Sequence, residues 1–164
     1  MPSAPSIAYA HKNITVGARW DFQDPEQQKV FLEIYGDLFR PYISVLTPDL
    51  AVPMSTLLLN GEIAMVFMPG EFFIQHQLEL KSDSPLKGTL LCGYADDFHL
   101  YFPTIRDAAA GGYGGVAATY VGVGAAEKMV MEAHVQIGKL AGLLRDFCRL
   151  EDFQLLEAKA TEFA

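Results

Sequence analysis

Apolar residues recur along this chain with two spacings, one typical of helices and the other of strands. After Asp24-Pro25-Glu26 the apolar positions follow the 3.6-residue period of a helix, at Val30, Phe31, Ile34, Leu38 and Phe39. Asp24 suits the N-cap and Pro25 the first helical position, while Pro41 cannot continue a helix. We therefore predict a helix over 26–40 with one apolar face.

Strand signals follow in the middle of the chain. Asn60-Gly61 separates two apolar runs, and both central residues of a type I′ hairpin turn need positive φ. This predicts strands at 53–59 and 62–68. The second run is apolar at nearly every position, which is typical of a central strand covered on both faces. A third buried strand is predicted over 88–94.

The remaining segments complete an α/β pattern. A helix over 71–81 between the strands at 62–68 and 88–94 predicts a parallel pair joined by a right-handed crossover. Residues 104–121 are rich in Gly and Ala and are expected to form an ordered loop around a site or interface. The longest helix is predicted over 124–144, with one apolar face.

The predicted fold is therefore α/β, a mixed sheet with flanking helices in a single domain over 1–164. A chain of 164 residues can bury a sizeable core. Residues 1–24 are expected to be irregular, apart from a short strand within 11–20. Residues 146–164 are expected to form a weakly helical tail.

Composition narrows the function classes. The net charge of −8 and the absence of a basic cluster argue against a nucleic-acid binder, because phosphate contacts need clustered Lys and Arg. Cys92 and Cys148 do not have the spacing of a metal-binding motif. Cys92 is expected to be a buried thiol. Two cysteines do not indicate whether the protein works in an oxidising or a reducing compartment. Residues 1–20 lack the features of a signal peptide. The longest apolar tract, 51–68, is interrupted by Pro53, so no membrane span is predicted.

Glu71 is the first candidate for chemistry. It follows a Pro-Gly turn at the carboxyl end of a predicted buried strand, where ligands sit in open α/β sheets. At the start of a predicted helix its carboxylate is also favoured by the helix dipole, so a simple capping role stays open. Tyr101, between Leu100 and Phe102, would on its own be interpreted as a core residue.

Four motifs in order give these residues a context. They are Met68-Pro69-Gly70-Glu71-Phe72-Phe73, the segment 95–104 with Tyr101, Gly111-Gly112-Tyr113-Gly114-Gly115, and the Gly-rich segment 121–127. Over about 52–140 this order resembles the C-terminal part of the catalytic domain of the neutral/alkaline (non-lysosomal) ceramidases, in their short bacterial ceramidase-like form. These are zinc-dependent amidases that hydrolyse N-acylsphingosines.

The resemblance implies that Glu71 and Tyr101 are zinc ligands. Asp96 and Phe98 depart from the family's Asn and Tyr, and Gly114 stands where the family has Glu, so no role of that Glu is transferred. A catalytic zinc takes three protein ligands and keeps a position for water. The family's two histidines lie upstream, where this chain has only His11 in a different context. We therefore expect them in sequence absent from this chain, which would be an incomplete part of a larger domain and inactive alone.

Three further features have competing interpretations. His76, on the predicted helix over 71–81, is interpreted as a partly buried and satisfied histidine. His99 either belongs to the core or points into the cleft with Tyr101. The Gly-rich segment before the last helix lacks the residues of a phosphate loop, so it is interpreted as a closely packed helix entry.

Two functional hypotheses follow. In the first, the chain supplies the late half of a zinc hydrolase that cleaves the amide bond of an N-acyl, ceramide-like lipid. Its partners would be that lipid, the missing N-terminal half of the domain, and a membrane surface contacted by the full protein. In the second, the chain is a non-catalytic α/β binding or assembly module. The resemblance implies a secreted, periplasmic or membrane-associated protein, although no targeting signal is recognised in this sequence.

Overall fold

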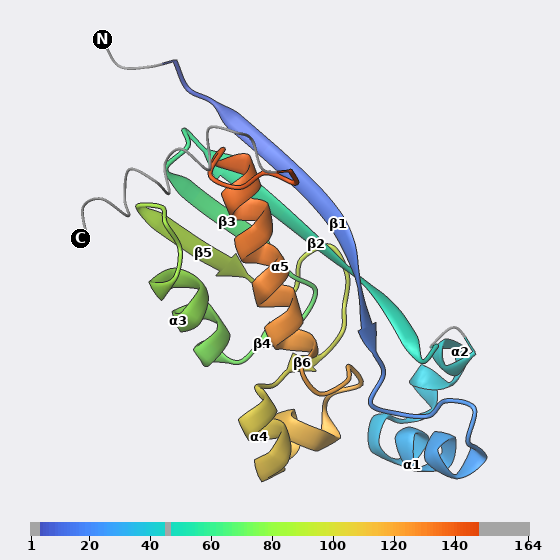
Figure 1. The fold of residues 1–164 in the computed structure, drawn as a ribbon. Helices are drawn as coiled ribbons and strands as arrows, with labels where there is room; N and C mark the ends of the chain where they lie inside the picture. Colours follow the sequence, from blue (N-terminus) through green and yellow to red (C-terminus); the bar gives the residue numbers. More distant parts are fainter. Residues whose placement is uncertain (1–3, 45–46, 148–164) are drawn as a thin grey trace.

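The computed structural model describes residues 4–44 and 47–147, which form a mixed α/β arrangement (Figure 1). The strands are β1 (Ile7–Gly17), β2 (Asp49–Leu59), β3 (Ile63–Phe67), β4 (Glu71–Phe72), β5 (Gly88–Cys92) and β6 (Tyr101–Phe102). The helices and helical turns are α1 (Pro25–Tyr35), η1 (Asp37–Phe39), α2 (Arg40–Ile43), α3 (Ile74–Ser82), α4 (Ile105–Ala110), η2 (Tyr113–Ala117) and α5 (Ala125–Leu140). This confirms the predicted fold class.

The main sheet has the order β1-β2-β3-β5, and β4 and β6 form a second, two-stranded sheet. β1–β2 and β2–β3 are antiparallel, whereas β3–β5 is parallel, as the intervening helix predicts. Asn60 (φ 52°) and Gly61 (φ 70°) form the predicted hairpin turn, in which the Glu62 N–H donates to the Leu59 carbonyl at 3.0 Å.

The N-terminal segment differs from its prediction. Residues 1–24 were expected to be irregular apart from a short strand within 11–20, yet β1 runs over Ile7–Gly17 and pairs with β2 along its whole length. β2 begins at Asp49, four residues earlier than predicted, and includes Pro53. A proline can lie in a strand where its missing N–H is not needed for the hydrogen-bond ladder. Backbone pairing thus extends both strands beyond the residues that their apolar patterns predicted.

The helix predicted over 26–40 is divided in three. Gly36, at φ 83°, ends α1, and the chain continues through η1 into α2. Pro41 does not end a helix but lies inside the first turn of α2, where its missing N–H costs no hydrogen bond. An aromatic cluster holds α1 in place: Phe31 is fully buried and its ring centroid lies 5.5 Å from that of Trp20.

Three boundaries in the second half also differ. The helix predicted over 71–81 begins only at Ile74, because Glu71 and Phe72 form β4. The loop predicted over 104–121 contains α4 and a single π-helical turn, η2, around its glycines. α5 covers Ala125–Leu140 of the predicted 124–144. Of the predicted tail over 146–164 and Cys148, only residues 146–147 are among those described.

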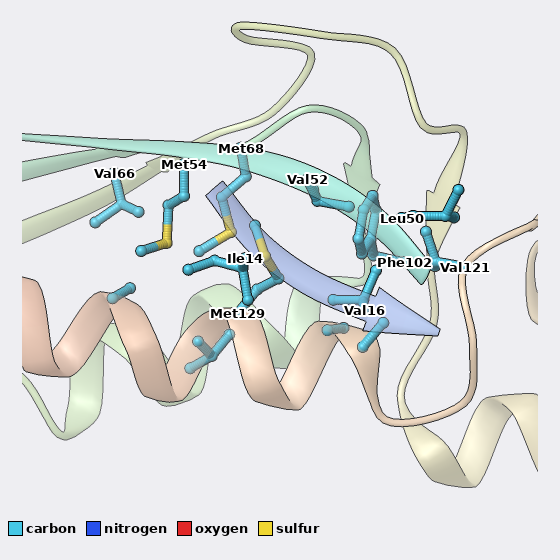
Figure 2. Packing of buried hydrophobic residues seen from close by; sticks show 14 of the residues in the cluster. Ile14, Val16, Leu50, Val52, Met54, Val66, Met68, Phe102, Val121 and Met129 are labelled. Atoms are coloured by element: carbon cyan, nitrogen blue, oxygen red, sulfur yellow. The ribbon is translucent and has the colours of Figure 1, made fainter. Parts of the chain in front are cut away.

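The core lies between the main sheet and α5, which crosses it, and α3 packs beside α5 on the same face (Figure 1). Side chains from β1, β2, β3 and α5 interleave there, including Ile14, Met54 and Met129, which are at most 2 % exposed (Figure 2). β3 is covered on one face only: Ala64 and Val66 are buried, whereas Ile63 is 41 % exposed. The prediction of a strand covered on both faces was therefore wrong for the described residues. None of the helices in the described ranges is long and apolar enough to cross a membrane.

Candidate functional site

The segment after β3 approaches the segment before β6 very closely. A Cβ atom on Gly70 would lie 2.4 Å from the Leu100 carbonyl oxygen and 2.7 Å from the Phe102 ring. The Glu71 N–H donates to the same Leu100 oxygen at 2.8 Å, and Leu100 has a positive φ of 54°. Glycine at position 70 therefore allows the turn to deliver Glu71 into β4, directly beside β6.

Glu71 and Tyr101 are direct neighbours in the parallel pair of β4 and β6. The Glu71 carboxylate also interacts with the Tyr101 phenol, whose pKa it raises. The Tyr94 hydroxyl, from the loop after β5, donates to Glu71 Oε1. The Tyr113 ring packs edge-to-face on Tyr101, with centroids 5.8 Å apart. We call Glu71, Tyr94, Tyr101 and Tyr113 the Glu71 cluster. Glu71 was expected at a helix start and lies instead in a strand.

The Glu71 carboxylate dominates the protonation of this cluster. Its hydrogen bond raises the pKa of Tyr94 to about 12, and its interaction with Tyr101 likewise raises the pKa of that phenol. An acceptor favours the neutral phenol, which donates, over the phenolate. The side chains are accessible: Tyr94 is 52 % and Tyr113 72 % exposed, while Glu71 and Tyr101 are half-buried. The cluster therefore presents protonated phenols around one carboxylate at the surface.

A metal could find two oxygen donors here, from Glu71 and Tyr101. Within residues 4–44 and 47–147, no group of three His, Cys, Asp or Glu side chains is arranged to hold a metal ion. A catalytic zinc needs three protein ligands, so the described residues fit part of such a site and not a whole one.

The glycine-rich turn η2 closes one side of the cluster. A Cβ atom on Gly114 would lie 3.0 Å from the Phe73 ring and 3.2 Å from the Tyr101 ring. A larger residue at position 114 would therefore require these rings to move. The prediction of an ordered loop around a site agrees with this packing, and Gly114 has a steric role beside Tyr101.

The two candidate histidines lie elsewhere. His76 is 1 % exposed and its ring packs edge-to-face with Phe72; neither ring nitrogen has a hydrogen-bond partner among the described residues, unlike the satisfied histidine that we expected. His99 is 8 % exposed, and its Nε2 lies 3.1 Å from Asp97 Oδ2. The ring of His99 contacts Tyr120, with ring centroids 5.6 Å apart, so His99 interacts with Asp97 and Tyr120 rather than with Tyr101.

A polar cluster on β1, β2 and the loop after β5 was not predicted from the sequence. Ser55 Oγ donates to Asp96 Oδ2 at 2.6 Å, and His11 Nδ1 and the Tyr9 hydroxyl lie 3.0 and 3.1 Å from the same Oγ. Because Ser55 gives its only hydrogen to Asp96, His11 and Tyr9 must donate to it. His11 is thus not placed as a base for Ser55, unlike in a catalytic triad. The pairing of β1 with β2 places Tyr9 and His11 near Ser55, and the loop after β5 brings Asp96 to it.

Two smaller predictions concern packing. Cys92 is half-buried rather than fully buried, and partial burial raises the pKa of its thiol. Gly122 confirms the closely packed helix entry: a Cβ atom there would lie 2.8 Å from the Gly17 carbonyl oxygen.

Comparison with known proteins gives a weak structural similarity. No protein-family model and no curated protein matches the chain. Among solved structures, the chain is similar to a ceramidase complexed with a compound named C2, with 19 % sequence identity and a TM-score of 0.41. The similarity covers 57 % of this chain and 14 % of the ceramidase chain, so this protein spans a small part of that neighbour's length. A likeness of this size leaves the assignment of a function to the geometry of the site.

Proposed function

We propose that the Glu71 cluster is the late half of a zinc-dependent hydrolase site that cleaves the amide bond of an N-acyl, ceramide-like lipid. The observation that supports this most is the meeting of the Glu71 carboxylate and the Tyr101 hydroxyl across β4 and β6. These are the two positions at which the resemblance described above implies zinc ligands. They also lie beyond the carboxyl ends of the parallel strands β3 and β5, where α/β proteins place their ligands.

Each residue of the cluster has a separate task in this proposal. Glu71 is a carboxylate ligand, and Tyr94 holds it from the other side by donating to Oε1, as outer hydrogen-bond partners of metal ligands commonly do. Tyr101 must lose its proton before it can ligate a metal as a phenolate, and the neighbouring Glu71 carboxylate disfavours this loss while no cation is bound. Metal binding at this pair therefore releases a proton and becomes tighter as the pH rises.

The remaining ligands would come from polypeptide other than the described residues. When bound, zinc would supply polarisation of the amide carbonyl and acidification of a water molecule. The isolated chain, with two donors, is expected to bind zinc more weakly than micromolar and to have no amidase activity.

Zinc titration followed by NMR tests the ligand roles directly, because weak binding still shifts individual resonances. We expect Zn²⁺ to shift the signals of Glu71 and Tyr101, more strongly at pH 8.5 than at pH 6.5. Glu71→Gln and Tyr101→Phe should each weaken binding by about tenfold or more, the equivalent of 1.4 kcal/mol. Glu79→Gln, an exposed carboxylate on α3, is the matched control and should leave the titration unchanged.

A specific observation favours the second candidate, a non-catalytic module. The Tyr94 hydroxyl already donates to Glu71, whose carboxylate also interacts with the Tyr101 phenol, so the cluster is a clasp that links the loop after β5 to β4 and β6. If the clasp is its only role, Glu71→Gln and Tyr101→Phe lower the free energy of unfolding while zinc shifts no resonance of the cluster. Micromolar or tighter zinc binding by the chain alone would instead show that the described residues suffice and that no missing half is needed.

A further inference from the structure

A cavity of about 890 Å³ lies on the other side of the loop that contains Asp97, Phe98 and His99. Its described walls come from four segments: η1, the beginning of β2 with the residues before it, this loop, and Tyr120 between η2 and α5. Its volume is within the range of about 300–1,000 Å³ that is typical of small-molecule sites. Among the described residues the cavity shares no lining residue with the Glu71 cluster; Phe98, which lines it, stacks on Tyr94 with ring centroids 5.8 Å apart.

Apolar side chains form much of the wall, and two of them are open to solvent. Leu38 is 86 % exposed and Phe98 50 % exposed, and both line the cavity together with Phe39 and Leu50. Single exposed apolar residues are common on proteins, but several that converge on one concave surface mark a binding site. An aliphatic chain is the simplest group that would cover them.

The polar groups of the wall select for a hydrogen-bond donor. Asp49 and Asp97 contribute carboxylates, and no Lys or Arg occurs among the described residues that line the cavity. A carboxylate only accepts, so the His99 Nε2 beside Asp97 carries the hydrogen, and Nδ1 of the neutral ring is then an acceptor. Nδ1 is buried, has no partner among the described residues and is closed to a ligand in the cavity, so the two carboxylates supply the acceptors.

We propose that this cavity binds a single-chain amphiphile with a primary amine head, its aliphatic chain lying against Leu38, Phe39 and Phe98 and its ammonium group beside Asp49 and Asp97. The charge of the wall excludes the matching fatty acid, because its carboxylate would meet two carboxylates and no cation. A long-chain alcohol would fill the same apolar surface without the charge interaction. The three head groups therefore separate the contribution of the chain from that of the charge.

Calorimetric titration with dodecylamine, dodecanol and dodecanoate, each below its micelle-forming concentration, tests the proposal. We expect dodecylamine to bind one molecule per chain, at least tenfold more tightly than dodecanoate, with dodecanol between them. Equal affinity for the amine and the acid, or no binding of the amine, would overturn the proposal.

Two sets of variants locate the site. Leu38→Asn should weaken dodecylamine binding about tenfold, while Leu78→Asn, the same exchange at an exposed leucine of α3, should not. Asp49→Asn combined with Asp97→Asn should abolish the preference for the amine over the alcohol and keep alcohol binding. Urea unfolding of each variant excludes misfolding as the cause. If Leu38→Asn and Leu78→Asn bind alike, the ligand lies elsewhere and the assignment is wrong.

This outcome is independent of the zinc proposal. The titrations contain no zinc, and Glu71→Gln should bind dodecylamine like the unaltered chain, since Glu71 does not line the cavity. A failed zinc titration with intact amine binding would therefore reject the hydrolase proposal alone, and the reverse result would reject the cavity proposal alone.

Discussion

At the scale of single residues, the chemistry of the candidate site depends on one carboxylate, that of Glu71, which faces two phenols. The Glu71 carboxylate raises the pKa of the Tyr94 and Tyr101 phenols above their ordinary value of 10.0 and so further favours the protonated phenols. A cation placed between Glu71 and Tyr101 would reverse this preference, because it favours phenolate. The protonation state of Tyr101 thus separates a metal site from a structural clasp.

His99 gives a prediction for the pH dependence of stability. Burial lowers the pKa of His99 below its ordinary value of 6.5, although Asp97 acts in the opposite direction, and its ring faces Asp97 and Tyr120. Below pH 6.5 the imidazole of His99 is protonated in the unfolded chain but still neutral in the folded chain. The contribution of His99 to the free energy of unfolding is therefore fully present above pH 6.5, and it declines as the pH falls towards the folded pKa. The slope cannot exceed about 1.4 kcal/mol per pH unit for one group.

Urea unfolding between pH 5 and pH 8 measures this slope. We expect His99→Gln to remove the part of the slope that lies below pH 6.5, since glutamine does not titrate. His11→Gln, which removes a histidine from the surface of β1, serves as the control for loss of an imidazole. Identical slopes in the unaltered chain and in His99→Gln would mean that His99 is not the group responsible.

At the scale of elements, the placement of Glu71 depends on one glycine. A methyl group on Gly70 would collide with the Leu100 carbonyl, which is backbone and cannot rotate away. We expect Gly70→Ala to destabilise the fold by about 1–3 kcal/mol, the usual cost of overpacking. Gly88→Ala in β5 is the matched control, because its nearest neighbours would be Ile63 atoms at 3.8 Å, an ordinary contact. Urea midpoints for the two variants make the comparison, and equal midpoints would contradict the close approach.

The elements that sequence analysis predicted correctly are those specified by local chemistry. Asn60-Gly61 carries its own turn preference, and the hairpin appears where predicted. β1 was missed over much of its length because Ile7 and Tyr9 are exposed, and only pairing with β2 makes this segment a strand. The helix predicted over 26–40 failed at Gly36, whose positive φ breaks an otherwise regular apolar period.

The candidate site shows the same division. The meeting of Glu71 and Tyr101 was anticipated from a resemblance of motifs, since neither residue alone stands out from a cap or a core residue; their role towards zinc stays a prediction. Tyr94 and Ser55 were missed because their partners, Glu71 and Asp96, are 23 and 41 residues away in sequence. Such contacts depend on strand register and turn geometry, which no periodicity encodes.

At the scale of the whole molecule, the described helices cover one face of the main sheet, and the side chains on its other face are only partly buried by the residues that the structure describes. α5 and α3 pack on the face that carries Ala64 and Val66, so the alternation of strand residues places Leu57, Met65 and Leu90 on the opposite face. These three residues stand side by side in the register of β2, β3 and β5, and Leu90 is 43 % exposed. Among residues 4–44 and 47–147, β5 is also the edge strand of the main sheet, so a partly buried apolar face and an edge without a described partner strand lie together.

A partly buried apolar face beside an edge strand favours association of the isolated chain. We expect sedimentation velocity to show a concentration-dependent equilibrium between monomer and larger species. Leu90→Lys should weaken it by about tenfold or more, because burying the new ammonium group without a partner costs more than the 1.4 kcal/mol that this factor represents. Leu78→Lys, at a leucine that is 58 % exposed on α3 and away from this face, should leave the equilibrium unchanged. A chain that stays monomeric at all concentrations would show that this face is stable in water. It would then favour the self-contained binding module over a domain that awaits its other half.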